Sequence, residues 1–346
     1  MFFIVNSKKK SSQLHITAMQ PVQMIWLVSL LLSIAFCQFI SYDEFHRDHL
    51  PQLLSLTNDS DENVILRFNK TRIPGSKESK DVQEFIINYF EKLDHEWLVD
   101  QDSFEENGFS FTNLVFSSTI AEKYIVFAVH YDSKIEPEGF IGAMDSAASC
   151  GILLYLARFI DNVYSLEQNL IDRTISAEYV GIKIVFFDGE EALKEWGPND
   201  SIYGAKHLAS KWDQKNILDT IDLFVLMDLI GSDEHVTIPS FFRGSHFYYE
   251  MLSELEDSYL ETRSKGTKSL VPTDHRFLEL GRGVIDDDHI PFYNAGIDVL
   301  HLIPLPFPQT WHTIHDTFDH LGQEEIYKWA ELISNFVINV VDLYRL

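Results

Sequence analysis

The chain has 346 residues, of which 45% are hydrophobic and 26 are Phe, so it can bury one large core or two ordinary ones. Its formal net charge of −26 at pH 7 argues against a general nucleic-acid-binding protein, because phosphate backbones are bound by clustered Lys and Arg. The same charge modestly favours substrates with a positive amino terminus through long-range attraction.

The first predicted element is an apolar segment near the N-terminus. Lys8, Lys9 and Lys10 precede an apolar run over residues 24–36, a pattern typical of a secretory signal. If the signal is not cleaved, the run over 22–40 is long enough to span a bilayer as an anchor. We therefore predict a signal peptide or signal anchor over residues 1–40, one folded domain over residues 45–346, and entry into the secretory pathway.

The cysteines and the glycosylation sequons agree with that route. Sequons begin at Asn58, Asn69 and Asn199, which predicts a glycoprotein. The two cysteines are Cys37, inside the signal, and Cys150. After cleavage Cys150 stands alone, so no intrachain disulfide can form.

From about residue 120 to the end, apolar runs that predict strands alternate with helical patterns. Strands are predicted over 124–129, 184–187, 223–227 and 299–303, and helices over 147–160 and 324–343, with a surface helix starting at 77–81. This alternation predicts a single α/β domain with a central mixed, largely parallel sheet flanked by helices.

A pair of adjacent carboxylates follows one of these strands. Gly189 permits a sharp turn after the apolar run, and Glu190 and Glu191 come directly after it. Two neighbouring carboxylates repel each other unless something positive lies beside them. The pattern favours a metal site in which one Glu is a ligand and its neighbour handles protons, although surface Glu-Glu pairs also occur without a function.

Other candidate metal ligands lie at the ends of other predicted strands. His130 and Asp228 end two strands, and His312 follows a proline-rich loop after a third. Asp145 opens the predicted helix after 147 and could be a helix N-cap or a ligand; the sequence favours neither. Because ligands gather at the carboxyl ends of strands in open α/β sheets, these residues predict a site at that edge.

Eight blocks in one order resemble the animal glutaminyl cyclases (glutaminyl-peptide cyclotransferases), whose fold is similar to that of the zinc aminopeptidases. The blocks are RIPGS (72–76), HYDSK (130–134), GAMDSA (142–147), FDGEEA (187–192), Trp196 with DSIYG (200–204), LMDLIG (226–231), DDHIPF (287–292), and HLIP (301–304) with WHT (311–313). The resemblance covers about residue 72 to the C-terminus. One departure is that Val129 stands where the vertebrate enzymes carry the cysteine that pairs with the position of Cys150, so this disulfide is absent.

The resemblance implies an activity and a role for each site residue. It implies that the enzyme converts N-terminal Gln of peptides or proteins to pyroglutamate with release of ammonia, with N-terminal Glu as a second candidate substrate. The implied ligands of a single Zn²⁺ are Asp145, Glu191 and His312. Glu190 would be the acid/base, supported by Asp228 and Asp287. The substrate pocket would be walled by four apolar residues: Trp196, Ile285, Phe307 and Trp311.

Two alternatives stay open. A two-zinc aminopeptidase could use His130, Asp145, Glu191, Asp228 and His312 as ligands, with Glu190 activating water. A metal-free binding module on the same scaffold is disfavoured by the intact acid and His residues. Outside the resemblance, Trp196 and Trp311 could be core residues and Asp287 could cap a turn. We also expect a monomer that is secreted, or anchored in the Golgi membrane if the signal stays uncleaved.

Overall fold

The computed structural model describes residues 42–170, 180–270 and 285–343, and its main compact unit begins at Asp48. The predicted signal segment at 1–40 and Cys37 lie outside the described residues. Residues 42–47, which precede the main unit, are helical.

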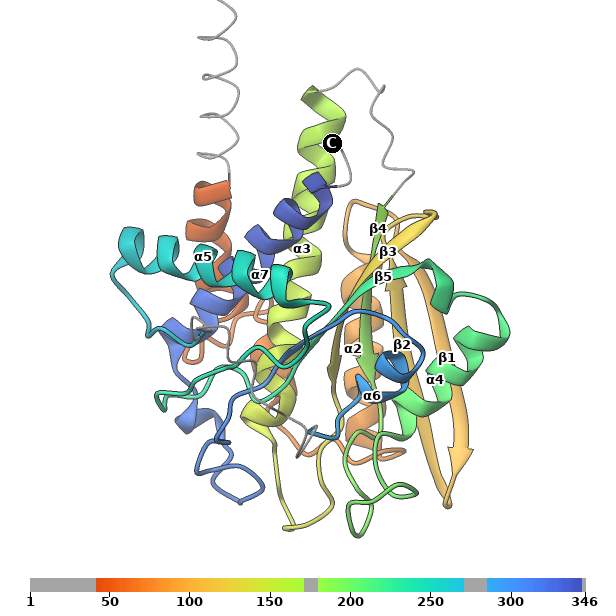
Figure 1. Cartoon of the computed structure of the whole chain (residues 1–346). Coiled ribbons are helices and arrows are strands. Elements are labelled where there is room, and N and C mark those ends of the chain that lie inside the picture. Colours follow the sequence, from red (N-terminus) through yellow and green to blue (C-terminus); the bar gives the residue numbers. More distant parts are fainter. Residues whose placement is uncertain (1–41, 171–179, 271–284, 344–346) are drawn as a thin grey trace, which may run out of the picture. The chain divides into compact units, whose positions relative to one another are not determined.

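The main unit is built on a six-stranded sheet in the order β1-β2-β4-β3-β5-β6 (Figure 1). The strands are β1 (Leu98–Glu106), β2 (Phe109–Ser117), β3 (Lys123–His130), β4 (Val180–Phe187), β5 (Ile221–Met227) and β6 (Val299–Leu302). The four strands from β4 to β6 are parallel, while β1 and β2 form an antiparallel hairpin that pairs with β4. The predicted α/β domain with a mixed, largely parallel sheet is confirmed.

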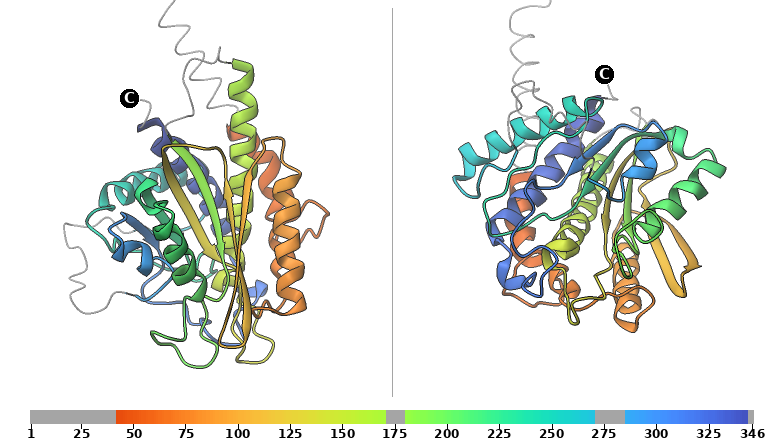
Figure 2. Two further views of the ribbon diagram at one scale, coloured as in Figure 1. Left: turned by 90° about the vertical axis from the view of Figure 1, so that its right-hand side faces the viewer. Right: turned by 60° about the horizontal axis from the view of Figure 1, so that its bottom comes forward.

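Helices cover both faces of the sheet (Figure 2). They are α2 (Lys77–Glu91), α3 (Ala148–Leu170), α4 (Tyr203–Gln214), α5 (His246–Arg263), α6 (Ile290–Asn294) and α7 (Gln323–Leu343), with the short turns η1 (Ile65–Phe68), η2 (Ala143–Ala147), η3 (Leu218–Thr220) and η4 (Phe318–His320). Helices α4 and α6 bury Trp212 and Phe292 against β2, β3, β4 and β5, while α3 packs on β3 and β4 with α2 and α7 beside it.

Helix α3 is the central core helix. Together with η2 it contains the stretch Ala143–Ser165, which is apolar and long enough to cross a membrane, but the most apolar window of this stretch is 94% buried inside the protein. Burial by the sheet and by α7 therefore accounts for its apolar composition.

The four predicted strands are confirmed, because buried parallel strands have the continuous apolar runs that make them visible in a sequence. The hairpin β1–β2 was missed, although its turn has the signature Asn107–Gly108, with both residues at positive φ. Helices α4 and α5 were missed as well.

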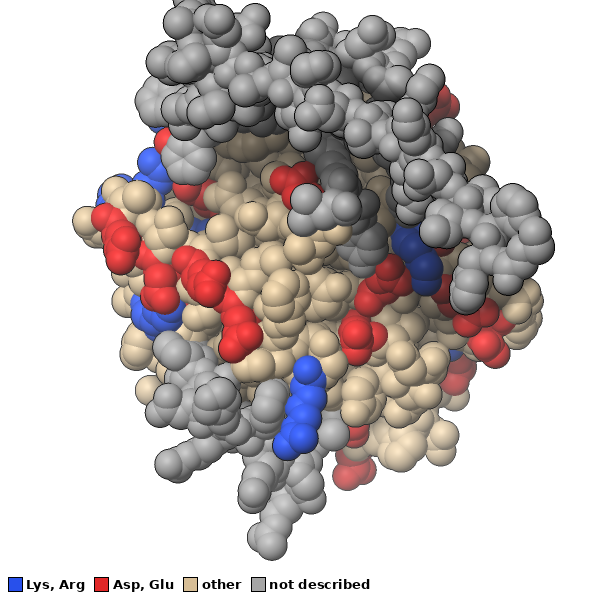
Figure 3. Space-filling view, turned by 45° about the horizontal axis from the view of Figure 1, so that its top comes forward, with Lys and Arg blue, Asp and Glu red and all other residues tan. Residues whose placement is uncertain are grey.

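Acidic side chains outnumber basic ones on the described part of the face in Figure 3, in keeping with the net charge.

Candidate metal centre

The predicted site residues gather at the carboxyl edge of the parallel strands. His130 is the last residue of β3, Asp228 follows β5 directly, and Glu190 and Glu191 lie in the turn after β4. His301 lies within β6, and Asp287 shortly precedes α6. The sheet therefore brings together groups that are far apart in the sequence, as expected for this class of fold.

Asp145, Glu191 and His312 form one group whose ligand atoms all lie within 4.8 Å of one another. Nε2 of His312 is 3.5 Å from Oδ2 of Asp145 and 3.6 Å from Oε2 of Glu191. Four ligands at about 2.1 Å from a tetrahedral metal are separated by about 3.4 Å, so these spacings match a zinc site better than hydrogen bonds.

Two further observations fit a metal in this group. Oδ2 of Asp145 and Oε1 of Glu191 are buried, and neither has a hydrogen-bond partner among the described residues. Burial lowers the pKa of His312 to about 4, so its imidazole is neutral and its Nε2 can offer a lone pair. Lys134 donates to Oε2 of Glu191 at 3.2 Å and balances part of the negative charge.

The backbone at Asp145 is not that of a helix cap. Asp145 has φ −111° and ψ 73°, and α3 begins only at Ala148. Its Oδ1 lies 3.1 Å from Nε2 of His130, and no amide of α3 donates to its carboxylate. Of the two readings of Asp145 that the sequence left open, the N-cap is wrong.

The turn that carries Glu190 and Glu191 is fixed by the carboxylate of Asp132. Oδ1 of Asp132 accepts from the amide of Glu190 at 3.1 Å, and Oδ2 accepts from the amide of Glu191 at 3.2 Å. Gly189 has φ +76°, and a Cβ there would lie 2.4 Å from the ring of Phe111. The sharp turn predicted at Gly189 is therefore present, and only glycine fits it.

Glu190 is buried beside several other acids. Burial, together with repulsion from Glu191, Asp287 and Asp288, raises the pKa of Glu190 well above its usual value, and His130 partly opposes this. Raised pKa values with such causes are typical of acid/base groups in active sites.

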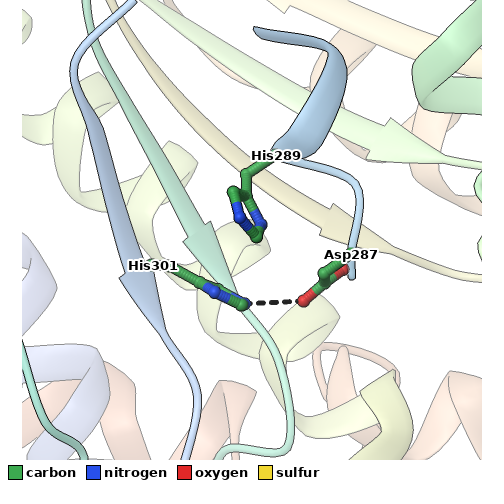
Figure 4. Close-up of side chains that lie close together, drawn as sticks. All are labelled: Asp287, His289 and His301. Atoms are coloured by element: carbon green, nitrogen blue, oxygen red, sulfur yellow. Dashed lines mark hydrogen bonds and ion pairs between the residues drawn. The ribbon is translucent and has the colours of Figure 1, made fainter. Parts of the chain in front are cut away.

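Asp287, His289 and His301 form a second buried group (Figure 4). Nε2 of His301 lies 2.7 Å from Oδ2 of Asp287, and the rings of His289 and His301 are 4.2 Å apart. Burial lowers the pKa of His301 to about 3, so the neutral ring can donate from Nε2 to Asp287. His289 is buried beside the pair, but neither of its ring nitrogens has a hydrogen-bond partner among the described residues, so no hydrogen bond joins it to the neighbouring acids.

A third group, His130, Asp145 and Asp228, is the one that a second metal would use. Nε2 of His130 lies 3.1 Å from Asp145 and 3.4 Å from Oδ1 of Asp228, and Nδ1 lies 3.3 Å from Asp132. Burial and repulsion from Asp145 and Asp287 raise the pKa of Asp228 to about 7. His130 therefore already has a carboxylate partner at each of its nitrogens.

The aromatic residues that were predicted to wall the substrate pocket are not core residues. The indole of Trp311 stacks on the imidazole of His312 at 3.8 Å, and Phe307 lies 4.6 Å from Trp311. Trp196 is 38% exposed, in the loop after Glu191. Ile285 is half-buried, two residues before Asp287. The core alternative for Trp196 and Trp311 is wrong.

Sequence reasoning missed the groups that hold the ligand loops in place. Arg72, Asp132 and Asp316 are almost fully buried and bond to backbone groups of distant loops. Arg72 and Asp132 lie in two of the blocks that carry the family resemblance, RIPGS and HYDSK, but the resemblance implied no role for either residue. Cys150, free and buried, donates from Sγ to the carbonyl of His130.

Comparison with known proteins agrees with this architecture. Residues 112–337 match the model of peptidase family M28. An uncharacterised protein of Saccharomyces cerevisiae is 45% identical over 86% of this chain and 90% of its own length. The glutaminyl-peptide cyclotransferase of Drosophila melanogaster is 36% identical over 77% of each chain.

A solved structure supports the same family relationship. The glutaminyl cyclase of Macrostomum lignano superposes with a TM-score of 0.71 at 30% identity, covering 81% of this chain and 88% of its own. The chain therefore belongs to peptidase family M28 and, within it, to the glutaminyl-peptide cyclotransferase family.

Proposed function

We propose that this protein is a zinc-dependent enzyme that cyclises N-terminal glutaminyl residues of peptides and proteins to pyroglutamate with release of ammonia. The observation that carries the proposal is the convergence of Asp145, Glu191 and His312 at zinc-ligand spacing, with the buried carboxyl of Glu190 next to Glu191. Membership of the cyclotransferase family supports the same reaction.

Three residues would hold one zinc ion: Asp145, Glu191 and His312. Two carboxylates and one imidazole leave a fourth position open for the substrate, as a catalytic zinc site requires. When bound there, the metal supplies a Lewis acid that polarises the amide oxygen of the substrate's Gln side chain.

Glu190 is proposed as the proton carrier. The substrate's own α-amine attacks the side-chain amide carbon, so no nucleophile from the protein is needed. Glu190 accepts a proton from the attacking amine and returns it to the departing nitrogen, which leaves as ammonia. Asp228 and Asp287 are proposed to support this exchange, with Asp287 held in place by the 2.7 Å hydrogen bond from His301.

The apolar residues are proposed to orient the substrate. Attacker and target belong to one residue, so catalysis depends mainly on folding that residue into a five-membered geometry. Trp196, Ile285, Phe307 and Trp311 would wall the space around the Gln side chain. Stacking of Trp311 on His312 holds one wall beside a metal ligand.

We also propose a cellular location, glycosylation sites and an oligomeric state for this protein. A signal peptide or anchor within residues 1–40 would direct the protein to the secretory pathway, for secretion or for retention in the Golgi membrane. Asn58, Asn69 and Asn199 are exposed and could carry glycans there. We propose that the enzyme acts as a monomer and binds no nucleic acid.

The decisive experiment is to mix the purified protein with a glutaminyl dipeptide and to measure ammonia and pyroglutamate. A leucyl peptide serves as the parallel substrate for aminopeptidase activity. Release of free leucine without formation of pyroglutamate would show that the enzyme is an aminopeptidase and would contradict the proposed cyclisation.

A further inference from the structure

The loop that leads to Asp145 is held in place through its backbone carbonyls and amides. Its residues run from Ile141 to Asp145 and form no regular hydrogen-bonding pattern of a strand or α-helix. Gly142 has φ +60°, and a Cβ at this position would lie 2.0 Å from the carbonyl oxygen of Asp145. This folded-back conformation is available only to glycine, and something must hold it.

Arg72 holds the first half of this loop. Nη1 donates to the carbonyl of Ile141 at 2.6 Å, and Nη2 donates to the carbonyl of Gly142 at 3.1 Å. The same guanidinium donates to the carbonyls of Tyr131 and Phe68 at 2.6 and 2.8 Å. Arg72 therefore fastens the loop to the segment that follows β3, which carries Asp132.

The burial of Arg72 makes these bonds important. Arg72 is 0% exposed, and within the described residues its guanidinium donates to backbone carbonyls and to no carboxylate oxygen. Burying a cation is costly unless its donors are satisfied, so the loops must bring their carbonyls to the fork of the guanidinium. A Lys at this position would keep the charge but could not reach the same set of acceptors.

Asp316 holds the second half of the loop. Oδ1 accepts from the amide of Met144 at 2.8 Å, and Oδ2 accepts from the amide of Asp145 at 3.2 Å. The carbonyl of Asp316 also accepts from the amide of Ala143 at 3.3 Å. The backbone amide of Asp316 also donates to the carbonyl of Thr313 at 3.0 Å, and this hydrogen bond closes the turn that follows His312.

The four peptide units between Ile141 and Asp145 are thus held by two buried residues that lie far apart in the sequence. We propose that Arg72 and Asp316 are positioning residues of the metal centre, which fix the carboxylate of Asp145 and couple its loop to that of His312. Like the proposed function, on which it rests, this assignment takes Asp145 and His312 as ligands. Preorganised ligands bind a metal more tightly, because no loop has to be ordered when the metal binds.

The test uses Asp316→Asn and Arg72→Lys, with zinc affinity as the primary readout. An amide at 316 keeps one acceptor but turns an NH₂ toward a backbone amide that needs an acceptor. We expect zinc affinity, measured by competition with a chromophoric chelator, to fall by about 10- to 100-fold in both variants. We also expect kcat for glutaminyl peptides to fall more than KM rises, because the aromatic residues stay in place.

Two matched controls separate positioning from general stability. Asp161→Asn alters a buried carboxylate of α3 that also accepts from a backbone amide, that of His95 at 2.6 Å. Arg67→Lys alters an arginine that donates to the carbonyl of Ser60 at 2.9 Å. Both controls should keep the wild-type zinc affinity, whatever happens to their melting temperatures.

The outcomes are distinct. Wild-type zinc affinity in folded Asp316→Asn, with a loss of melting temperature like that of Asp161→Asn, would overturn the proposal and leave a structural role. If Arg72→Lys does not fold, Asp316→Asn decides alone. If the wild-type protein binds zinc and Glu191→Gln weakens that binding but no ammonia is released, the proposed reaction fails while the positioning test still stands.

Discussion

The indole ring of Trp311 lies on the imidazole ring of His312, with centroids 3.8 Å apart and planes 20° apart. A proposed metal ligand and a proposed substrate wall therefore form one stacked unit. His312 also has φ +55°, an uncommon conformation for a residue with a side chain, and such strain is often found at functional sites.

Trp311→Ala should impair turnover without unfolding the protein. Loss of the wall lets the reacting amide move, and a displacement of about 1 Å can cost on the order of 100-fold in rate. Steady-state kinetics with glutaminyl peptides and circular dichroism would measure both effects. The matched control is Trp212→Ala, at a buried core Trp, which should lose about 3–5 kcal/mol of stability. Wild-type turnover by Trp311→Ala would remove Trp311 from the site.

Glu190→Gln and Glu191→Gln should separate proton transfer from metal binding. Glu190→Gln removes the proposed proton carrier and should lower kcat by about 100-fold or more while zinc stays bound. Glu191→Gln replaces a charged ligand with a neutral amide and should lower zinc affinity. Elemental analysis after dialysis and ammonia release give the two readouts. Equal loss of activity with full zinc in both variants would contradict this division of roles.

Active protein should contain one zinc ion per chain after dialysis. The proposed ligands form one group, whereas His130 in the neighbouring group is already engaged by Asp132 and Asp145. Chelation should abolish ammonia release, and one equivalent of zinc should restore it. Two zinc ions per chain, together with release of leucine from leucyl peptides, would favour the two-zinc aminopeptidase.

Lys183, which lies away from the metal site, should make the free energy of unfolding depend on pH. Burial lowers the pKa of Lys183 from 10.5 to about 8, and the amine donates to Oγ of Ser117 at 2.7 Å. Between pH 8 and 10.5 the unfolded chain binds more protons at this residue, so its contribution to stability rises with pH in that window. Below pH 8 the cost of burying the cation is fully present.

Lys183→Met removes that cost. Relative to wild type, the variant should therefore gain more free energy of unfolding at pH 7 than at pH 10, by on the order of 2 kcal/mol. Urea denaturation at the two pH values measures the difference. Lys123→Met, at the partly exposed first residue of β3, is the matched control. A difference between Lys183→Met and wild type that is the same at both pH values would contradict the prediction.

The sequence predicted the inner strands because each is a continuous apolar run, and it predicted the site because acids and His follow those runs. It did not predict β1, whose exposed pattern offers no apolar periodicity: only Asp102 is fully buried in that strand. Helix α5 was missed for a similar reason, since its acidic residues mask a narrow buried stripe that includes Tyr249 and Leu252.

The supporting groups of the site are the part that sequence reasoning could not reach. Asp132 and Asp316 act on backbone amides, and Arg72 acts on carbonyls, so their partners have no side-chain signature. Only the fold shows which distant peptide units they meet. The resemblance named the proposed ligands but not the groups that hold them.

The wide spacing of Asp145, Glu191 and His312 along the chain has a consequence for biosynthesis. The three side chains meet only when β3, β4 and the turn after β6 are all in place. A partly folded chain offers at most isolated ligands, which bind zinc weakly. Zinc would therefore bind late, after the chain has folded. The zinc content of a preparation should then report the fraction of correctly folded molecules.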